Sequence, residues 1–84
     1  MHYVYILKSK KDNSKYIGMT CDLKSRLQEH NNGETKSNKS KIPYVLEWYC
    51  CFNNKSRALS FEKYLKSSSG HAFRNKRLLS TEQK

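Results

Sequence analysis

Three short segments that follow one another near the N-terminus constrain the fold of this chain most. They are YVYIL at residues 3–7, YIGMT at residues 16–20 and DLKSRLQEH at residues 22–30. The first two carry β-branched and aromatic residues and are separated by a polar stretch that contains Asp12-Asn13-Ser14, so they predict a hairpin. The third predicts a helix that begins at an Asp22 N-cap as soon as the second strand ends.

This arrangement predicts a cluster of polar side chains between the hairpin and the helix. Arg26 and His30 stand one helical turn apart and therefore share a stripe of the predicted helix. The two strands bring Tyr5 and Tyr16 within reach of that stripe. Gly18 in the second strand leaves room for another backbone or a ligand to approach closely.

The second half of the chain predicts one more strand and two more helices. A third strand is predicted at residues 44–52, with Tyr44, Leu46, Trp48, Cys50 and Phe52 on one face. Asn54 or Ser56 is expected to cap a helix that runs to about Ser67. A break at residues 67–70 and a short helix at residues 72–79 follow. Residues 32–41 predict a flexible cationic loop that either contacts phosphates or is a solvated connector.

Glu62 is a charged residue on an otherwise apolar helical stripe. On a helical wheel, Ala58, Phe61 and Leu65 fall together and Glu62 falls among them. The carboxylate is therefore expected to point toward the protein. An inward carboxylate costs free energy unless it is paired or binds a metal. A salt bridge to Arg26 would satisfy it without any catalysis.

Length and charge limit the classes of function that this chain can have. At 84 residues, with a formal charge of +10, it predicts one domain at residues 1–79, a frayed tail at residues 80–84, and attraction to a polyanion. Nucleic acid is the first candidate and an anionic membrane surface the second, but no apolar run approaches the roughly 20 residues of a spanning helix. Three cysteines without CxxC spacing predict free thiols and a cytoplasmic protein.

Together these residues resemble the GIY-YIG nuclease superfamily. The YIG at residues 16–18, followed by Arg26, His30 and a helical Glu62, is its combination of residues. The segment SRALSFEKYLKSSSGHAFRNKRL resembles the small stand-alone bacterial members, so the similarity covers nearly the whole chain. One departure is that Tyr3 and Val4 stand where Gly-Ile would be. The resemblance implies an α+β fold with a three-stranded mixed or antiparallel sheet, its first strand central, flanked by helices.

The resemblance also implies catalytic roles for Tyr5, Tyr16, Arg26, His30 and Glu62. Glu62 would hold a single Mg²⁺ or Mn²⁺ ion, and Arg26 would bind the phosphate through its planar fork. Either tyrosine would activate water, with Tyr5 slightly favoured, because neighbouring cations favour the phenolate. His30 would orient the water or act as the base itself.

Each of these residues also has a purely structural explanation. Strand tyrosines are commonly packing residues, an arginine on a basic helix is commonly solvated, and His30 near a helix C-terminus favours the dipole. The phosphate-binding candidates are Lys24, Lys36, Lys39, Lys41, Arg74, Lys76 and Arg77.

The expected function is a metal-dependent DNA endonuclease of low sequence specificity, with DNA preferred over RNA. It could be selective for DNA structure. The alternatives are a non-catalytic basic nucleic-acid-binding module, or a subunit that needs a protein partner to grip the substrate.

Overall fold

The sheet has its first strand in the middle. The computed structural model describes residues 1–33 and 36–73, and in them β1 (His2–Ser9) lies between β2 (Lys15–Thr20) and β3 (Tyr44–Phe52). Both pairings are antiparallel, which confirms the predicted α+β fold with a central first strand. The three cysteines are free thiols, as predicted. Among the described helices, none combines the length and apolar character needed to cross a membrane.

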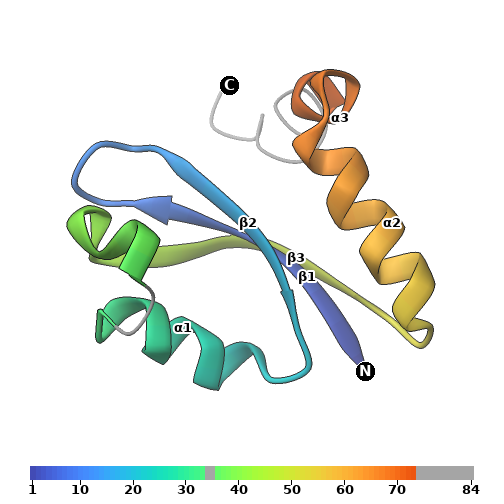
Figure 1. Cartoon of the computed structure of the whole chain (residues 1–84), viewed down its shortest axis with the longest axis horizontal. Helices are drawn as coiled ribbons and strands as arrows, with labels where there is room; N and C mark the ends of the chain where they lie inside the picture. Colours follow the sequence, from blue (N-terminus) through green and yellow to red (C-terminus); the bar gives the residue numbers. More distant parts are fainter. Residues whose placement is uncertain (34–35, 74–84) are drawn as a thin grey trace.

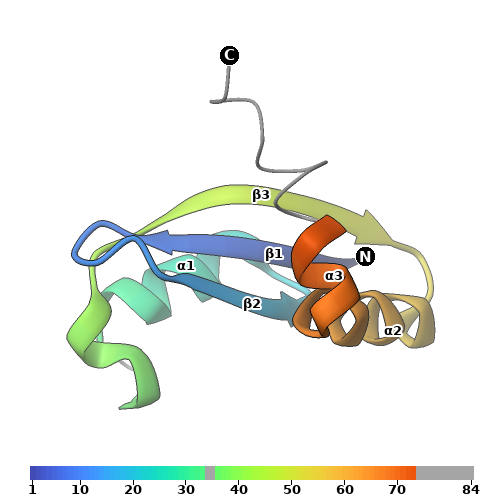
Figure 2. The ribbon, with the colours of Figure 1, turned by 90° about the horizontal axis from the view of Figure 1, so that it is seen from above.

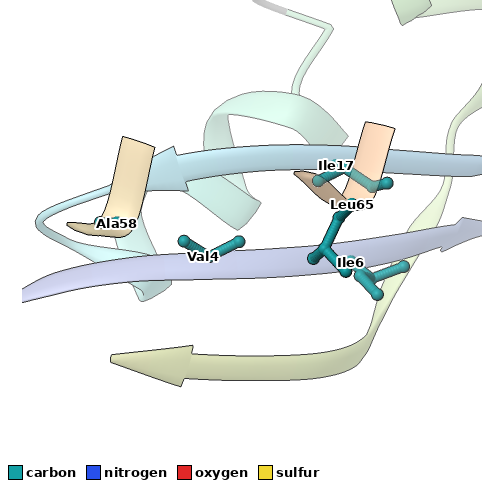
Figure 3. Close-up of a cluster of buried hydrophobic side chains, with 5 residues drawn as sticks. All are labelled: Val4, Ile6, Ile17, Ala58 and Leu65. Carbon is teal, nitrogen blue, oxygen red and sulfur yellow. The ribbon is translucent and has the colours of Figure 1, made fainter. Parts of the chain in front are cut away.

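A helix covers each face of the sheet, which lies between α1 (Leu23–Asn31) and α2 (Lys55–Lys66) (Figures 1 and 2). Residues of β1 alternate between the two faces, as the pleat of a strand requires. Val4 and Ile6 pack with Ala58 and Leu65 of α2, and Figure 3 shows this cluster with Ile17. On the other face, Tyr5 and Leu7 pack with Tyr44 and with Leu23 and Leu27 of α1. β1 is therefore buried on both sides.

A β-bulge in β3 overturns the prediction that its apolar residues share one face. Ile6 pairs with Trp48 and Leu7 with Leu46, so Glu47 is an extra residue in the ladder. A one-residue shift moves every following side chain to the opposite face. Tyr44 and Leu46 therefore pack on the α1 side, whereas Trp48, Cys50 and Phe52 pack on the α2 side.

Polar caps set the ends of the helices. Asp22 caps α1 by accepting from the Ser25 amide at 3.1 Å, as predicted, and Asn54 caps α2 in the same way. The helix α3 (Ser68–Phe73) begins earlier than predicted, because the Ser67 hydroxyl accepts from the Gly70 amide at 3.1 Å. The predicted positions 74–79 of that helix and the predicted tail at residues 80–84 lie outside the described residues.

The predicted flexible loop after α1 contains a 3₁₀ helix, η1 (Lys36–Lys41). Its end is fixed to the hairpin, because the buried Ser9 hydroxyl donates to the Lys41 carbonyl at 2.6 Å. Lys41 Nζ also pairs with Asp12 Oδ2 at 2.8 Å. These contacts had no signal in the local sequence, because the partners are about 30 residues apart, and the closure of such a loop depends on tertiary packing.

Candidate active site

The phenol of Tyr5 is the centre of a polar cluster on the α1 face. Tyr5 comes from the central strand and is only 1% exposed. Its hydroxyl lies 3.2 Å from Nε2 of His30, which the last turn of α1 holds in a fully buried position. The group that His30 contacts is therefore the hydroxyl of Tyr5. That His30 orients the water or acts as the base stays a prediction.

Tyr16 and Arg26 complete the cluster next to Tyr5. The ring centroid of Tyr16, from β2, lies 4.7 Å from that of His30 and 6.3 Å from that of Tyr5. Arg26 Nη1 donates to Glu29 Oε1 at 2.8 Å, and this bond is the largest reason that the pKa of Arg26 is raised. The hydroxyl of Tyr5 and, more weakly, that of Tyr16 raise the pKa of Arg26 further. The sequence thus predicted correctly that these side chains meet.

The pKa of Tyr5 is raised, which is opposite to the sequence expectation. Burial is the largest cause, and it outweighs the hydrogen bond to Arg26 that lowers the pKa. The charges of Tyr16 and Glu62 raise it further. Desolvation disfavours the phenolate because the charged form loses more hydration than the neutral form. Tyr5 is therefore a neutral hydroxyl at neutral pH, suited to hydrogen bonding.

Gly18 of β2 makes room for the Tyr5 phenol. A Cβ at this position would lie 2.5 Å from the Tyr5 hydroxyl oxygen and 3.1 Å from Cε2 of Tyr16. Gly18 pairs with Tyr5 across the two strands and is buried. Here glycine is required by close approach, since any larger residue would displace the ring that contacts His30 and Arg26.

Gly18→Ala should displace Tyr5 and lower the free energy of unfolding by about 1–3 kcal/mol, as overpacking does. Urea unfolding measures this cost. In a Tyr5→Leu background, which lacks the phenol, the same substitution should cost clearly less. Equal costs in both backgrounds would mean that the strand itself, and not the Tyr5 ring, requires glycine.

Glu62 stands on α2, which covers the face of the sheet opposite this cluster. Its side chain is 17% exposed, which fits the predicted inward orientation, and its Oε2 accepts from Lys66 Nζ at 3.0 Å. The Glu62 charge contributes to the raised pKa of Tyr5, so the carboxylate lies within electrostatic reach of the phenol. The sequence left open a salt bridge between Arg26 and Glu62, and the structure, which describes both side chains, does not form it. Arg26 pairs with Glu29, and Glu62 pairs with Lys66.

The chemistry of Glu62 fits a single hard cation. Among the side chains that the structure describes, which do not include that of His71, no three His, Cys, Asp or Glu residues form a metal-binding group. Mg²⁺ and Mn²⁺ do not need one, because such ions keep several waters and use one or two carboxylates together with substrate phosphate. The Glu62 carboxylate already accepts from a cation, the Lys66 ammonium. An ion held by this one carboxylate would take the place of the Lys66 ammonium.

The expected phosphate contacts are only partly described. Lys24 on α1 and Lys39 on η1 are exposed, whereas Lys41 is engaged by Asp12. The side chain of Lys36, and the whole of Arg74, Lys76 and Arg77, lie outside the described part of the chain.

The sequence interpretation missed Glu29 and Lys66, the partners of Arg26 and Glu62. Their helical spacings, three residues after Arg26 and four after Glu62, were the signal for both.

Comparisons with known proteins agree with this architecture. Residues 1–77 match the family described as the GIY-YIG catalytic domain. A UPF0213 protein of Staphylococcus haemolyticus is 42% identical over 69 residues, which are 81% of this chain and 83% of that protein. One of Vibrio campbellii is 41% identical over 64 residues, 75% of this chain and 61% of that protein.

A solved structure supports the same relationship. The solution NMR structure of a UPF0213 protein from Bacillus halodurans superposes with a TM-score of 0.58 at 33% identity. The match covers 96% of this chain and 84% of that one. The sequence relatives and the similar solved structure therefore support the same family. The chain belongs to the GIY-YIG domain family and, within it, to the UPF0213 proteins.

Proposed function

We propose that this protein hydrolyses phosphodiester bonds in DNA with the help of one divalent cation. The observation that carries the proposal is the group formed by Tyr5, Tyr16, Arg26 and His30 beside Gly18, with the charge of Glu62 within reach. A guanidinium, two phenols and a carboxylate supply phosphate binding, water activation and cation binding. Membership of the GIY-YIG family supports a nuclease-type hydrolase.

Arg26 is the group that would bind the scissile phosphate. Its side chain is 34% exposed, and its raised pKa keeps it charged. Glu29 takes one edge of the guanidinium, which leaves further N–H donors for a phosphate oxygen. The fixed positive charge would stabilise the negative charge that develops on the phosphate during attack.

Tyr16 is the better candidate for the tyrosine whose phenolate takes a proton from water. It is half-buried, whereas Tyr5 is 1% exposed and its pKa is raised. In this scheme Tyr16 first loses its hydroxyl proton to solvent. The phenolate then takes a proton from the water whose oxygen attacks phosphorus, the bond from phosphorus to the leaving oxygen breaks, and that oxygen takes a proton from solvent. Tyr5 and His30 hold the neighbouring polar groups in place. A Mg²⁺ or Mn²⁺ ion at Glu62 would polarise a phosphoryl oxygen and stabilise the departing alkoxide.

Lys66 should compete with the cation for Glu62, because its ammonium bonds the same carboxylate at 3.0 Å. Lys66→Gln removes this competing charge and should strengthen Mn²⁺ binding by about 2- to 5-fold, consistent with the small energy of an exposed ion pair. Electron paramagnetic resonance of free Mn²⁺ measures the affinity without any substrate. Lys63→Gln, on the same helix, removes an equal charge and should have a smaller effect. Equal effects would assign the change to net charge alone.

A second function is favoured by the same ion pairs. Arg26 and Glu62 each have a protein partner, as residues with structural roles would. A basic module that binds nucleic acid without cutting it, or a subunit that needs a protein partner, would also carry the formal charge of +10.

We include a cytoplasmic location in the proposal, because free thiols suit a reducing compartment.

Incubation with duplex, nicked and branched DNA in Mg²⁺ or Mn²⁺ tests the proposed function. Cleavage should require the ion, stop with a chelator, and vary little with sequence, because contacts to phosphates position a protein on DNA but carry no direct sequence information. An RNA of matched structure tests the preference for DNA. Salt-sensitive binding without cleavage under all these conditions would support the binding module.

A further inference from the structure

A groove of about 530 Å³ lies on the α1 face of the sheet, beside the first turn of α1. Its apolar lining comes from Leu23, Leu27 and Leu46. The rings of Tyr3 and Tyr49 form an aromatic wall, with centroids 6.0 Å apart and planes at 57°. Tyr49 is 51% exposed, so a large part of its ring is available to a ligand.

The groove adjoins the candidate active site. Tyr49 pairs directly with Tyr5 across β3 and β1, so the two side chains are neighbours on the same face of the sheet. Leu23, Leu27 and Leu46 also pack against the buried cluster that contains Tyr5. A ligand that occupies the groove therefore lies next to the residues that we assign to phosphodiester cleavage.

The chemistry of the groove selects its occupant. A flat, apolar ligand can stack on Tyr49, and a phosphate attached to it would be attracted to Lys24. The Asp22 carboxylate also lines the groove, but it accepts from the Ser25 amide as the cap of α1. The net charge of +10 attracts such an anion to the protein. A nucleotide has both of these parts, a flat base and a phosphate. In a duplex, however, the faces of each base are covered by its stacked neighbours, so only an unpaired base can present a face to the tyrosine.

We propose that the groove between α1 and β3 binds an unpaired nucleobase of single-stranded DNA through stacking on Tyr49. The inference rests on the proposed function, and it names the substrate class: DNA with a single-stranded segment beside the bond that is cut. Tyr3 supports the Tyr49 ring from the side, and Lys24 contacts the adjoining phosphate.

Binding of fluorescein-labelled oligonucleotides tests this subsite. Fluorescence anisotropy in the presence of a chelator compares an eight-nucleotide single strand with a duplex of the same length. Tyr49→Ala should weaken single-strand binding about 10-fold, as loss of one stacked base does, and change duplex binding less than about 2-fold. Tyr49→Trp should restore single-strand binding. Tyr64→Ala, which removes an equally large and 41% exposed ring from α2, should leave it unchanged.

Each of the following results would overturn the proposal, as would the absence of any effect of Tyr49→Ala. Tyr49→Ala could weaken single strand and duplex equally, Tyr64→Ala could match it, or sedimentation could show that Tyr49 holds a dimer of this chain. The test is separate from the proposed cleavage. If Tyr49→Ala weakens only single-strand binding and the protein does not cut DNA, the subsite is kept and the nuclease is rejected. If the protein cuts DNA and Tyr49→Ala does not change single-strand binding, the nuclease is kept and the subsite is rejected.

Discussion

Arg26→Ala should lower the rate of the proposed metal-dependent DNA cleavage by about 10²–10³-fold, which is the expected cost of removing one group that stabilises transition-state charge. Arg26 lies against both phenols and is the cation of this cluster. Single-turnover cleavage of a labelled branched DNA measures the loss, since it separates the chemical step from product release. Arg26→Lys keeps the charge but not the planar fork, so it should recover only part of the rate.

The matched control for Arg26 is Arg57→Ala. Arg57 is an exposed arginine near the start of α2 and is outside the proposed site. This substitution removes the same charge and should leave the rate of the chemical step within about 2-fold, because a solvated surface charge acts mainly on long-range attraction. If both variants lost the same activity, Arg26 would act only through net charge, and the assignment of the phosphate-binding role would be rejected.

Glu62→Gln should remove the cation and lower cleavage by about 10²–10³-fold, comparable with the loss of one preorganised charge. The amide is nearly the same size as the carboxylate, so the packing of α2 is kept while the negative charge is lost. Two measurements apply: single-turnover cleavage and the Mn²⁺ affinity. Both should fall together, because the same carboxylate serves both. Raising the Mn²⁺ concentration should restore part of the rate if weakened binding is the cause.

Glu47→Gln is a close control for Glu62→Gln. The Glu47 side chain is 18% exposed and pairs with Lys15 at 2.6 Å, whereas Glu62 is 17% exposed and pairs with Lys66 at 3.0 Å. The two substitutions therefore remove carboxylates of similar burial and pairing. Glu47 stands at the β3 bulge, apart from the proposed site. Loss of Mn²⁺ binding in both variants, or in neither, would contradict a cation site at Glu62.

The sequence determined the local structure because its signals are local. The β-branched and aromatic segments gave the strands, and the caps at Asp22 and Asn54 act within one helical turn. The convergence of Tyr5, Tyr16, Arg26 and His30 also followed from short connections. Little spacer separates the second strand from the helix, so few arrangements are possible. The resemblance to the GIY-YIG superfamily supplied the strand order.

Tertiary structure decided the features that depend on partners far apart in the sequence. The bulge at Glu47 is a feature of the pairing between β3 and β1, and it sends Trp48 to the face opposite Leu46. The pKa of Tyr5 is raised because α1 and the sheet together exclude water from the phenol. No local pattern reports burial of that kind, because burial is the summed effect of elements that meet only in the folded chain.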